Sequence, residues 1–213
     1  VTISGGDIII TDAVTNQANE NISFDGSSIT LTTANSDVAA TGSGAVSGTA
    51  TSNIELTNGS SITTVDGGIT LSADQQATPT TGDFHGILVV TATVDSTGNG
   101  NILLQGLGGT SANNRGVFSN GVISGGLAGT TLTIDGTAGA GAVASADGVK
   151  INTGGVVTSN GGDVIVTGVA GSNGTNFSYG VDVRGQVDAG GSGSVTITGI
   201  GGTGSGSTQQ GVL

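Results

Sequence analysis

Short apolar segments recur along this chain at a nearly constant distance, and this period constrains the fold more than any other feature. In the later copies a glycine directly precedes the segment, as in RGVFS, DGVKI and YGVDV. A fixed period in this range is typical of repeat architectures, in which each unit buries its apolar face against its neighbours. One class of segment recurs at intervals of 30 to 33 residues and starts at Ile22, Ile54, Ile87, Val117, Val149, Val181 and Val212.

Two further classes of segment accompany the first, and each has seven members. The segments alternate apolar and polar residues between Asn-Gly, Asp-Gly and Gly-Gly turns, which indicates half-buried β-strands. The second class runs through Ile3, Ile29, Ile62, Val94, Val122, Val156 and Val187. The third class runs through Ile8, Val38, Ile69, Ile102, Leu132, Val164 and Val195.

Three strand classes with one common period predict a parallel β-helix of three strands per coil, with about seven coils of roughly 30 residues. Hairpins use the same turns, but a meander has no reason to space its strands three by three. Parallel crossovers are almost always right-handed, so we expect a right-handed coil. On this interpretation NISFDGSSITL (21–31) and NIELTNGSSITT (53–64) are successive coils that stack strand on strand.

The inward positions of this helix can be named from the alternation. The chain has 43 glycines, four Phe, one Tyr and no Cys, Met or Trp, so its core must consist of Ile, Val, Leu and Ala. Like side chains stacked on like side chains can still pack closely. We predict one inward ladder of Ile22, Ile54, Ile87, Val117, Val149 and Val181, and another of Ile69, Ile102, Leu132, Val164 and Val195.

Charge and the length of the apolar runs exclude two classes of partner. Three Lys or Arg residues stand against fifteen Asp or Glu, and the net charge is −12. A nucleic acid backbone would be repelled rather than bound. No apolar run approaches the roughly 20 residues that span a bilayer, so we expect no direct membrane insertion.

The strand pattern continues to both ends, from VTIS at the start to GVL at the finish. An open solenoid end presents unpaired strand edges. We therefore expect residues 1–213 to form a single β-helix domain that is a segment of a longer solenoid or a unit that stacks end to end with copies of itself.

The stretches GGDVIVTG and GSVTITG, with the Gly-Val strand starts, resemble the β-helical repeat regions of large bacterial surface proteins of the filamentous haemagglutinin and autotransporter-passenger type. The resemblance covers the whole chain, although the period is longer than is usual for haemagglutinin-type repeats. It implies a secreted or cell-surface structural or adhesive role, without catalytic residues and with a host or matrix glycan or protein as partner. The alternative is a carbohydrate-active or glycan-binding β-helix.

Few side chains suggest a catalytic or binding role. We expect ion pairs between Lys150 and Asp182, with Arg184 nearby, and between Arg115 and Asp147. At a solvent-exposed rim each pair contributes about 0 to 1 kcal/mol to stability. Outward Leu88 and Phe118, on adjacent coils, predict a lateral contact, and the long connections after the third strand, such as residues 72–84, predict a ridge for partner contact.

No cofactor is expected from the sequence, and loosely bound surface calcium is the one candidate. The calcium-binding nonapeptide of acidic β-rolls is absent. His85, the only histidine, has no Cys, second His or adjacent carboxylate pair near it in sequence and is expected to be a solvated corner residue. Four aspartates precede glycine, where we expect them to bond the backbone of a turn: Asp25, Asp66, Asp135 and Asp147.

Overall fold

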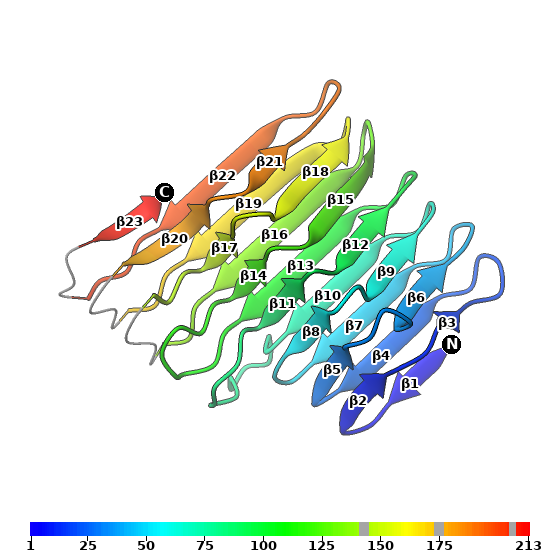
Figure 1. Ribbon diagram of the computed structural model, residues 1–213, viewed down its shortest axis with the longest axis horizontal. Coiled ribbons are helices and arrows are strands. Elements are labelled where there is room, and N and C mark those ends of the chain that lie inside the picture. The colour runs from blue at the N-terminus through cyan, green and yellow to red at the C-terminus, as the bar shows by residue number, and fades with distance from the viewer. Residues whose placement is uncertain (141–144, 173–176, 205–207) are drawn as a thin grey trace.

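The chain forms a parallel β-helix with three strands per coil, which confirms the predicted fold. The computed structural model describes residues 1–140, 145–172, 177–204 and 208–213. Within these residues there are 23 strands and no helix, arranged in three parallel sheets. Neighbouring strands of each sheet come from successive coils, so the chain winds around one axis from the N-terminus to the C-terminus (Figure 1).

Each coil contributes one strand to each sheet, in the order sheet A, sheet B, sheet C. Sheet A contains β1 (Thr2–Ser4), β4 (Ile22–Gly26), β7 (Val46–Ala50), β10 (Ile69–Ala73), β13 (Ile102–Leu107), β16 (Thr131–Thr137), β19 (Asp163–Val169) and β22 (Val195–Ile200). Sheet B contains β2 (Asp7–Ile10), β5 (Ser28–Leu31), β8 (Ile54–Thr57), β11 (Ile87–Val90), β14 (Val117–Ser119), β17 (Val149–Ile151), β20 (Ser178–Val183) and β23 (Gln209–Val212). Sheet C contains β3 (Val14–Thr15), β6 (Asp37–Ala40), β9 (Ser61–Thr64), β12 (Thr93–Ser96), β15 (Val122–Leu127), β18 (Val156–Asn160) and β21 (Gln186–Asp188).

Side chains that face the helix axis form stacked aliphatic ladders. Successive side chains of a strand point to opposite faces, so every second residue is buried. In sheet A, Ile69, Ile102 and Leu132 are register partners in consecutive strands, and each is at most 1% exposed. In sheet B the same holds for Ile54 and Ile87. This stacking packs the aliphatic side chains closely, and among the described residues Phe24 is the one aromatic side chain in the main core cluster.

Of the eleven residues predicted to face inward, ten are at most 1% exposed and one is not. Val195 is 42% exposed, because it lies in β22, the last strand of sheet A, which is covered on one side only. The buried ten are Ile22, Ile54, Ile69, Ile87, Ile102, Val117, Leu132, Val149, Val164 and Val181.

The prediction that Ile22 and Ile54 belong to one ladder is wrong. Ile22 lies in sheet A and pairs with Val46, whereas Ile54 lies in sheet B and pairs with Ile29. The cause is β7, a strand that the sequence analysis missed. It adds a coil, so that Val46 follows Ile22 by 24 residues and Ile69 follows Val46 by 23. The second of the two related stretches therefore begins in sheet B, one sheet later than the first. Its first strand, β8, pairs with β5, the last strand of the first stretch.

Other members of the predicted classes also change place. Ile3 lies in sheet A, Ile8 and Ile29 lie in sheet B, and Val38 lies in sheet C. Further along, Val122 is 38% exposed on the outer face, and its neighbour Ile123 faces the axis. The predicted second class is thus one residue out of register at β15 and at β18, where Val157 and not Val156 faces the axis, because two adjacent residues of each strand are apolar.

A double row of glycines explains the glycine that precedes the sheet B strands in the sequence. In sheet A, Gly106, Gly136, Gly168 and Gly199 are register partners in consecutive strands. A Cβ atom on any of them would overlap the carbonyl oxygen of a second glycine: Gly116, Gly148, Gly180 and Gly211, respectively. Because both rows lack side chains, sheets A and B can approach closely at this corner.

We expect the Gly168→Ala substitution to destabilise the fold. Its added methyl group would overlap the backbone of Gly180, which cannot move without disturbing sheet B. Overpacking of this kind costs about 1–3 kcal/mol. Urea denaturation should show a lower midpoint for Gly168→Ala, while Gly6→Ala, whose Cβ would have no atom within 4 Å, should behave as the unsubstituted chain. Equal midpoints for both variants would contradict the close approach of the two sheets.

Candidate functional site

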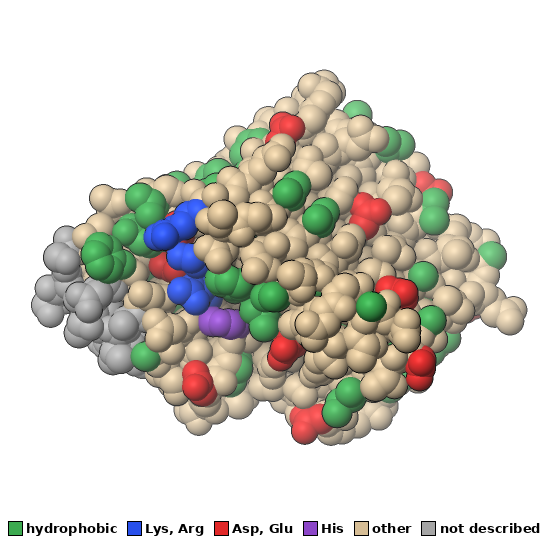
Figure 2. All heavy atoms as spheres, viewed as in Figure 1, with side chains coloured by type: hydrophobic (Ala, Val, Ile, Leu, Met, Phe, Trp, Pro, Cys, Tyr) green, Lys and Arg blue, Asp and Glu red, His purple; other side chains and the backbone are tan. Residues whose placement is uncertain are grey.

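The outer face of sheet B carries a row of unlike side chains at one register position. Glu55, Leu88, Phe118, Lys150 and Asp182 are register partners in the consecutive strands β8, β11, β14, β17 and β20. The three basic side chains of the chain and its one histidine gather around this row (Figure 2). The candidate site is the outer face of sheet B around this row, and its residues lie between Asn53 and Arg184 in the sequence.

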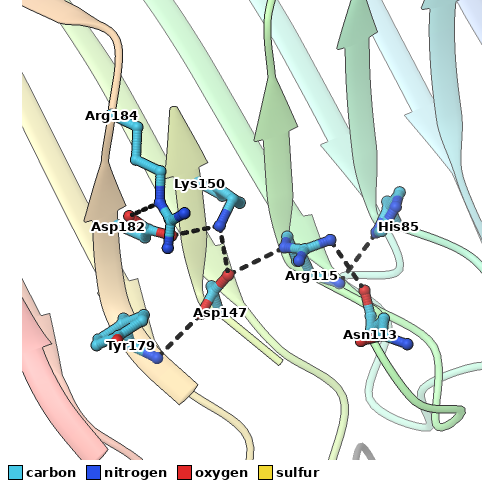
Figure 3. Close-up of polar contacts among 8 residues, drawn as sticks. All are labelled: His85, Asn113, Arg115, Asp147, Lys150, Tyr179, Asp182 and Arg184. Carbon is cyan, nitrogen blue, oxygen red and sulfur yellow. Dashed lines mark hydrogen bonds and ion pairs between the residues drawn. The ribbon is translucent and has the colours of Figure 1, made fainter. Parts of the chain in front are cut away.

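Five charged residues form one connected network at the later end of the row (Figure 3). Arg115 Nε lies 3.0 Å from Asp147 Oδ2, and Lys150 Nζ lies 3.7 Å from the same oxygen. Lys150 also contacts Asp182 Oδ2, and Arg184 Nε lies 3.0 Å from Asp182 Oδ1. The structure thus brings both predicted ion pairs together and joins them through Lys150.

The expectation of solvent-exposed rim pairs is wrong, because the carboxylates are buried. The Asp147 side chain is 1% exposed and that of Asp182 is 0% exposed. Burial raises the pKa of Asp147, while hydrogen bonds from the Tyr179 N–H (3.0 Å) and the Arg115 guanidinium lower it. Removing one partner of a buried pair costs about 3–5 kcal/mol, far more than at a surface. The network therefore contributes substantially to the stability of the outer face of sheet B.

His85 is packed into this face and is not the solvated residue that was expected. Its ring stacks on Phe118 with centroids 5.6 Å apart and an interplanar angle of 15°. The Arg115 N–H donates to His85 Nδ1 at 3.1 Å, and the Arg115 guanidinium lies over Phe118 at 5.4 Å. Burial, and then the charge of Arg115, lowers the pKa of His85 to about 4. At neutral pH the ring is therefore uncharged, and its proton lies on Nε2 because Nδ1 accepts.

The two residues predicted to make a lateral contact have different surroundings. Phe118 is half-buried because His85 and Arg115 cover its ring. Leu88, its register partner in β11, lines a hollow instead. The structure therefore assigns Phe118 to a contact within the chain.

A hollow of about 270 Å³ opens beside the ion network. Three successive coils build it. Glu55 and Leu88 come from adjacent strands of sheet B, and the other residues come from the connections between sheets A and B. The hollow is lined by Asn53, Glu55, Asp83, Phe84, His85, Leu88 and Asn114.

Asp74, which the sequence analysis did not single out, anchors the connection that supplies Asp83, Phe84 and His85. This residue is fully buried just after β10, and its Oδ1 accepts from the Thr80 N–H (2.7 Å) and from Gln76 Nε2 (2.5 Å). Gln76 Nε2 also donates to the Thr51 carbonyl at 2.9 Å. Burial raises the pKa of Asp74, and the hydrogen bonds from Thr80 and Gln76 partly oppose this rise. No motif marks it, because its partners lie in a loop and in the preceding coil.

The predicted ridge of connections is present with shifted bounds, since residues 72 and 73 belong to β10. The connections at residues 74–86 and 108–116 are hydrogen-bonded across coils, with Gly109 N–H to the Phe84 carbonyl at 2.9 Å and Ser111 N–H to the Gly82 carbonyl at 3.1 Å. These bonds extend the ladders of the sheets into the loops. The hollow thus lies on an ordered part of the ridge.

The four aspartates considered for calcium do not share a site. Asp25 and Asp135 lie within β4 and β16, so the prediction that they occupy turns is wrong. Asp66 accepts from the Asn99 N–H (3.1 Å) and from Asn99 Nδ2 (2.9 Å), and Asp147 belongs to the ion network. Within the described ranges, no three His, Cys, Asp or Glu side chains are grouped to hold a metal ion.

The fold and this surface define a parallel β-solenoid with a buried ion network and a neighbouring hollow on one outer face. Comparisons with protein-family models, with curated proteins and with solved structures found no match. In the part of the chain that the structure describes, no helix is long and apolar enough to cross a membrane.

We expect Asp182→Asn to destabilise the fold by about 3 kcal/mol, the lower end of the range for a broken buried pair, because Lys150 keeps Asp147 as a partner. Denaturant unfolding at pH 7 measures the change. Asp188→Asn, which alters an exposed carboxylate in β21, should shift stability by less than about 0.5 kcal/mol. Equal small effects of the two substitutions would show that the network behaves as a surface feature.

The lowered pKa of His85 predicts a pH-dependent stability. The unfolded chain binds a proton near pH 6.5 and the folded chain near pH 4, so this contribution is full above pH 6.5 and is lost as the pH falls towards 4. Between pH 7 and pH 5 the loss should be at most about 2 kcal/mol. Denaturant midpoints at both pH values should fall less for His85→Gln than for the unsubstituted chain. The same fall in both proteins would rule out a neutral, packed histidine.

Proposed function

We propose that this chain is a non-catalytic structural and adhesive segment of a bacterial cell-surface or extracellular fibre. The observation that carries the proposal is the continuity of the three parallel ladders over the described residues. Backbone hydrogen bonds between coils resist load along the axis, and outward side chains repeat at the strand spacing of about 4.8 Å. Such a rod can present an extended surface to a partner.

Two features support kinship with haemagglutinin-type or autotransporter-passenger repeats. The coils that begin at Ile22 and Val46 are 24 and 23 residues long. They are therefore closer than the later coils to the shorter period of haemagglutinin-type repeats. The net charge of −12 keeps a secreted rod soluble.

The ion network supports a structural role for the basic side chains. Lys150 contacts both Asp147 and Asp182, and its side chain is 12% exposed. A lysine held in this way is poorly placed to act as a general base on a polysaccharide. Its role here is to join two buried carboxylates.

A carbohydrate-active β-helix remains the second candidate, favoured by the carboxylates of Glu55 and Asp83 in the wall of one hollow. A pair of carboxylates is the machinery of glycoside hydrolysis. Incubation with neutral and acidic polysaccharides, followed by assay of new reducing ends and of unsaturated products, separates the two functions. We expect no cleavage. Cleavage that is lost in Glu55→Gln would establish the enzyme instead.

Adhesion is tested with beads that carry the folded chain. Under flow over mucin-coated glass, we expect these beads to be retained at least about tenfold more than beads that carry albumin, since many copies bind together. Beads that carry the chain after unfolding in urea serve as the matched control, because the composition is the same and the ladders are lost. Equal retention of folded and unfolded chain would contradict an adhesive surface built by the fold.

A further inference from the structure

We propose that the hollow on sheet B binds one uncharged sugar ring of a partner glycan. This inference rests on the proposed adhesive function and names the ligand class of its surface. The hollow is the place where polar groups from three coils converge around two apolar side chains.

The polar groups of the wall suit a ligand rich in hydroxyls. The carboxylates of Glu55 and Asp83 accept hydrogen bonds, and adjacent hydroxyls can donate to the two oxygens of one carboxylate. The amides of Asn53 and Asn114 can both donate and accept. His85 adds a ring N–H, because its other nitrogen is occupied by the Arg115 N–H. Hydroxyl groups need this mixture of donors and acceptors.

The apolar part of the wall suits the C–H face of a sugar ring. Phe84 and Leu88 line the hollow, and both side chains are half-buried. A pyranose presents C–H bonds on its faces and hydroxyls around its rim, which matches an aromatic and an aliphatic side chain set among polar groups. An inorganic ion or an ammonium group would leave this apolar surface uncovered.

Charge distinguishes between classes of sugar. The wall contains two carboxylates and no Lys or Arg, and all three basic side chains of the chain belong to the neighbouring ion network. A uronic, sialic or sulfated sugar would meet repulsion without a free cation to bind it. The site therefore favours an uncharged ring over an anionic one.

The wall is held in place before a ligand arrives. Glu55 and Leu88 lie on strands, His85 is stacked on Phe118, and Asn114 Nδ2 donates to the Gly82 carbonyl at 3.2 Å. A preformed wall lowers the entropic cost of binding. At about 270 Å³ the hollow falls just below the roughly 300–1,000 Å³ of pockets for drug-sized ligands, so it suits a single ring.

Saturation-transfer NMR on the full chain tests the site. The probes are the methyl glycosides of glucose, galactose and mannose, with glucuronic acid and glucosamine as charged counterparts. We expect at least one neutral glycoside to bind with a dissociation constant of order 1 mM, which suits a ligand of this size. Glu55→Gln and Asp83→Asn should each weaken binding at least about fivefold, because each removes a charged acceptor without changing the shape of the wall.

The control is Asp12→Asn, an exposed carboxylate in the connection between β2 and β3, which should leave binding unchanged. Phe84→Ala provides a second variant that tests the apolar wall alone. Absence of transfer to all three neutral glycosides at about 20 mM, unchanged binding in both carboxylate variants, or tighter binding of either charged sugar would overturn the proposal.

The bead assay distinguishes failure of the proposed sugar site from failure of the proposed adhesive function. If beads adhere but no neutral sugar binds, the hollow is not the sugar site and the adhesive function stands. If a neutral sugar binds in the hollow but beads do not adhere, the site stands and the adhesive function fails.

Discussion

The stacking of each coil directly on the previous one is the constraint on which this structure depends. Parallel ladders place residues about 30 positions apart in register, so Ile69, Ile102 and Leu132 share one inward row. The same registry places Glu55, Leu88 and Phe118 in one outward row. Core and surface are therefore built by one geometric rule, and a strand missed or misread by one residue alters both.

The candidate site is a consequence of that registry combined with burial. Arg115, Asp147 and Asp182 come from three successive coils and meet only because the coils stack. Their burial makes the network strong, and His85 beside it stays neutral for the same reason. The hollow lies beside the network at Leu88 and Glu55, the part of the row that has no basic side chain.

The sequence predicted the sheets best where coils are regular. From Ile54 onward the first strand class corresponds to sheet B, because each copy begins with a strongly apolar residue after a glycine or a polar residue. The strand at Val46–Ala50 was missed since its inward residues after Val46 are Gly48 and Ala50, which give no apolar alternation. Gly48 is tolerated because Leu71, Ile29 and Ile54 fill the space beside it.

The sequence by itself determined the architecture: alternating β-branched segments at a common period can bury their apolar faces only by stacking as coils. It also determined the two ion-pair partnerships, since equal spacing along a coil implies contact between coils. Only the tertiary structure decided that Asp147 and Asp182 are buried, that His85 is packed on Phe118, and that seven residues enclose a hollow. The physical reason is that burial depends on how connections of unequal length fold over a sheet, and the strand period carries no information on that.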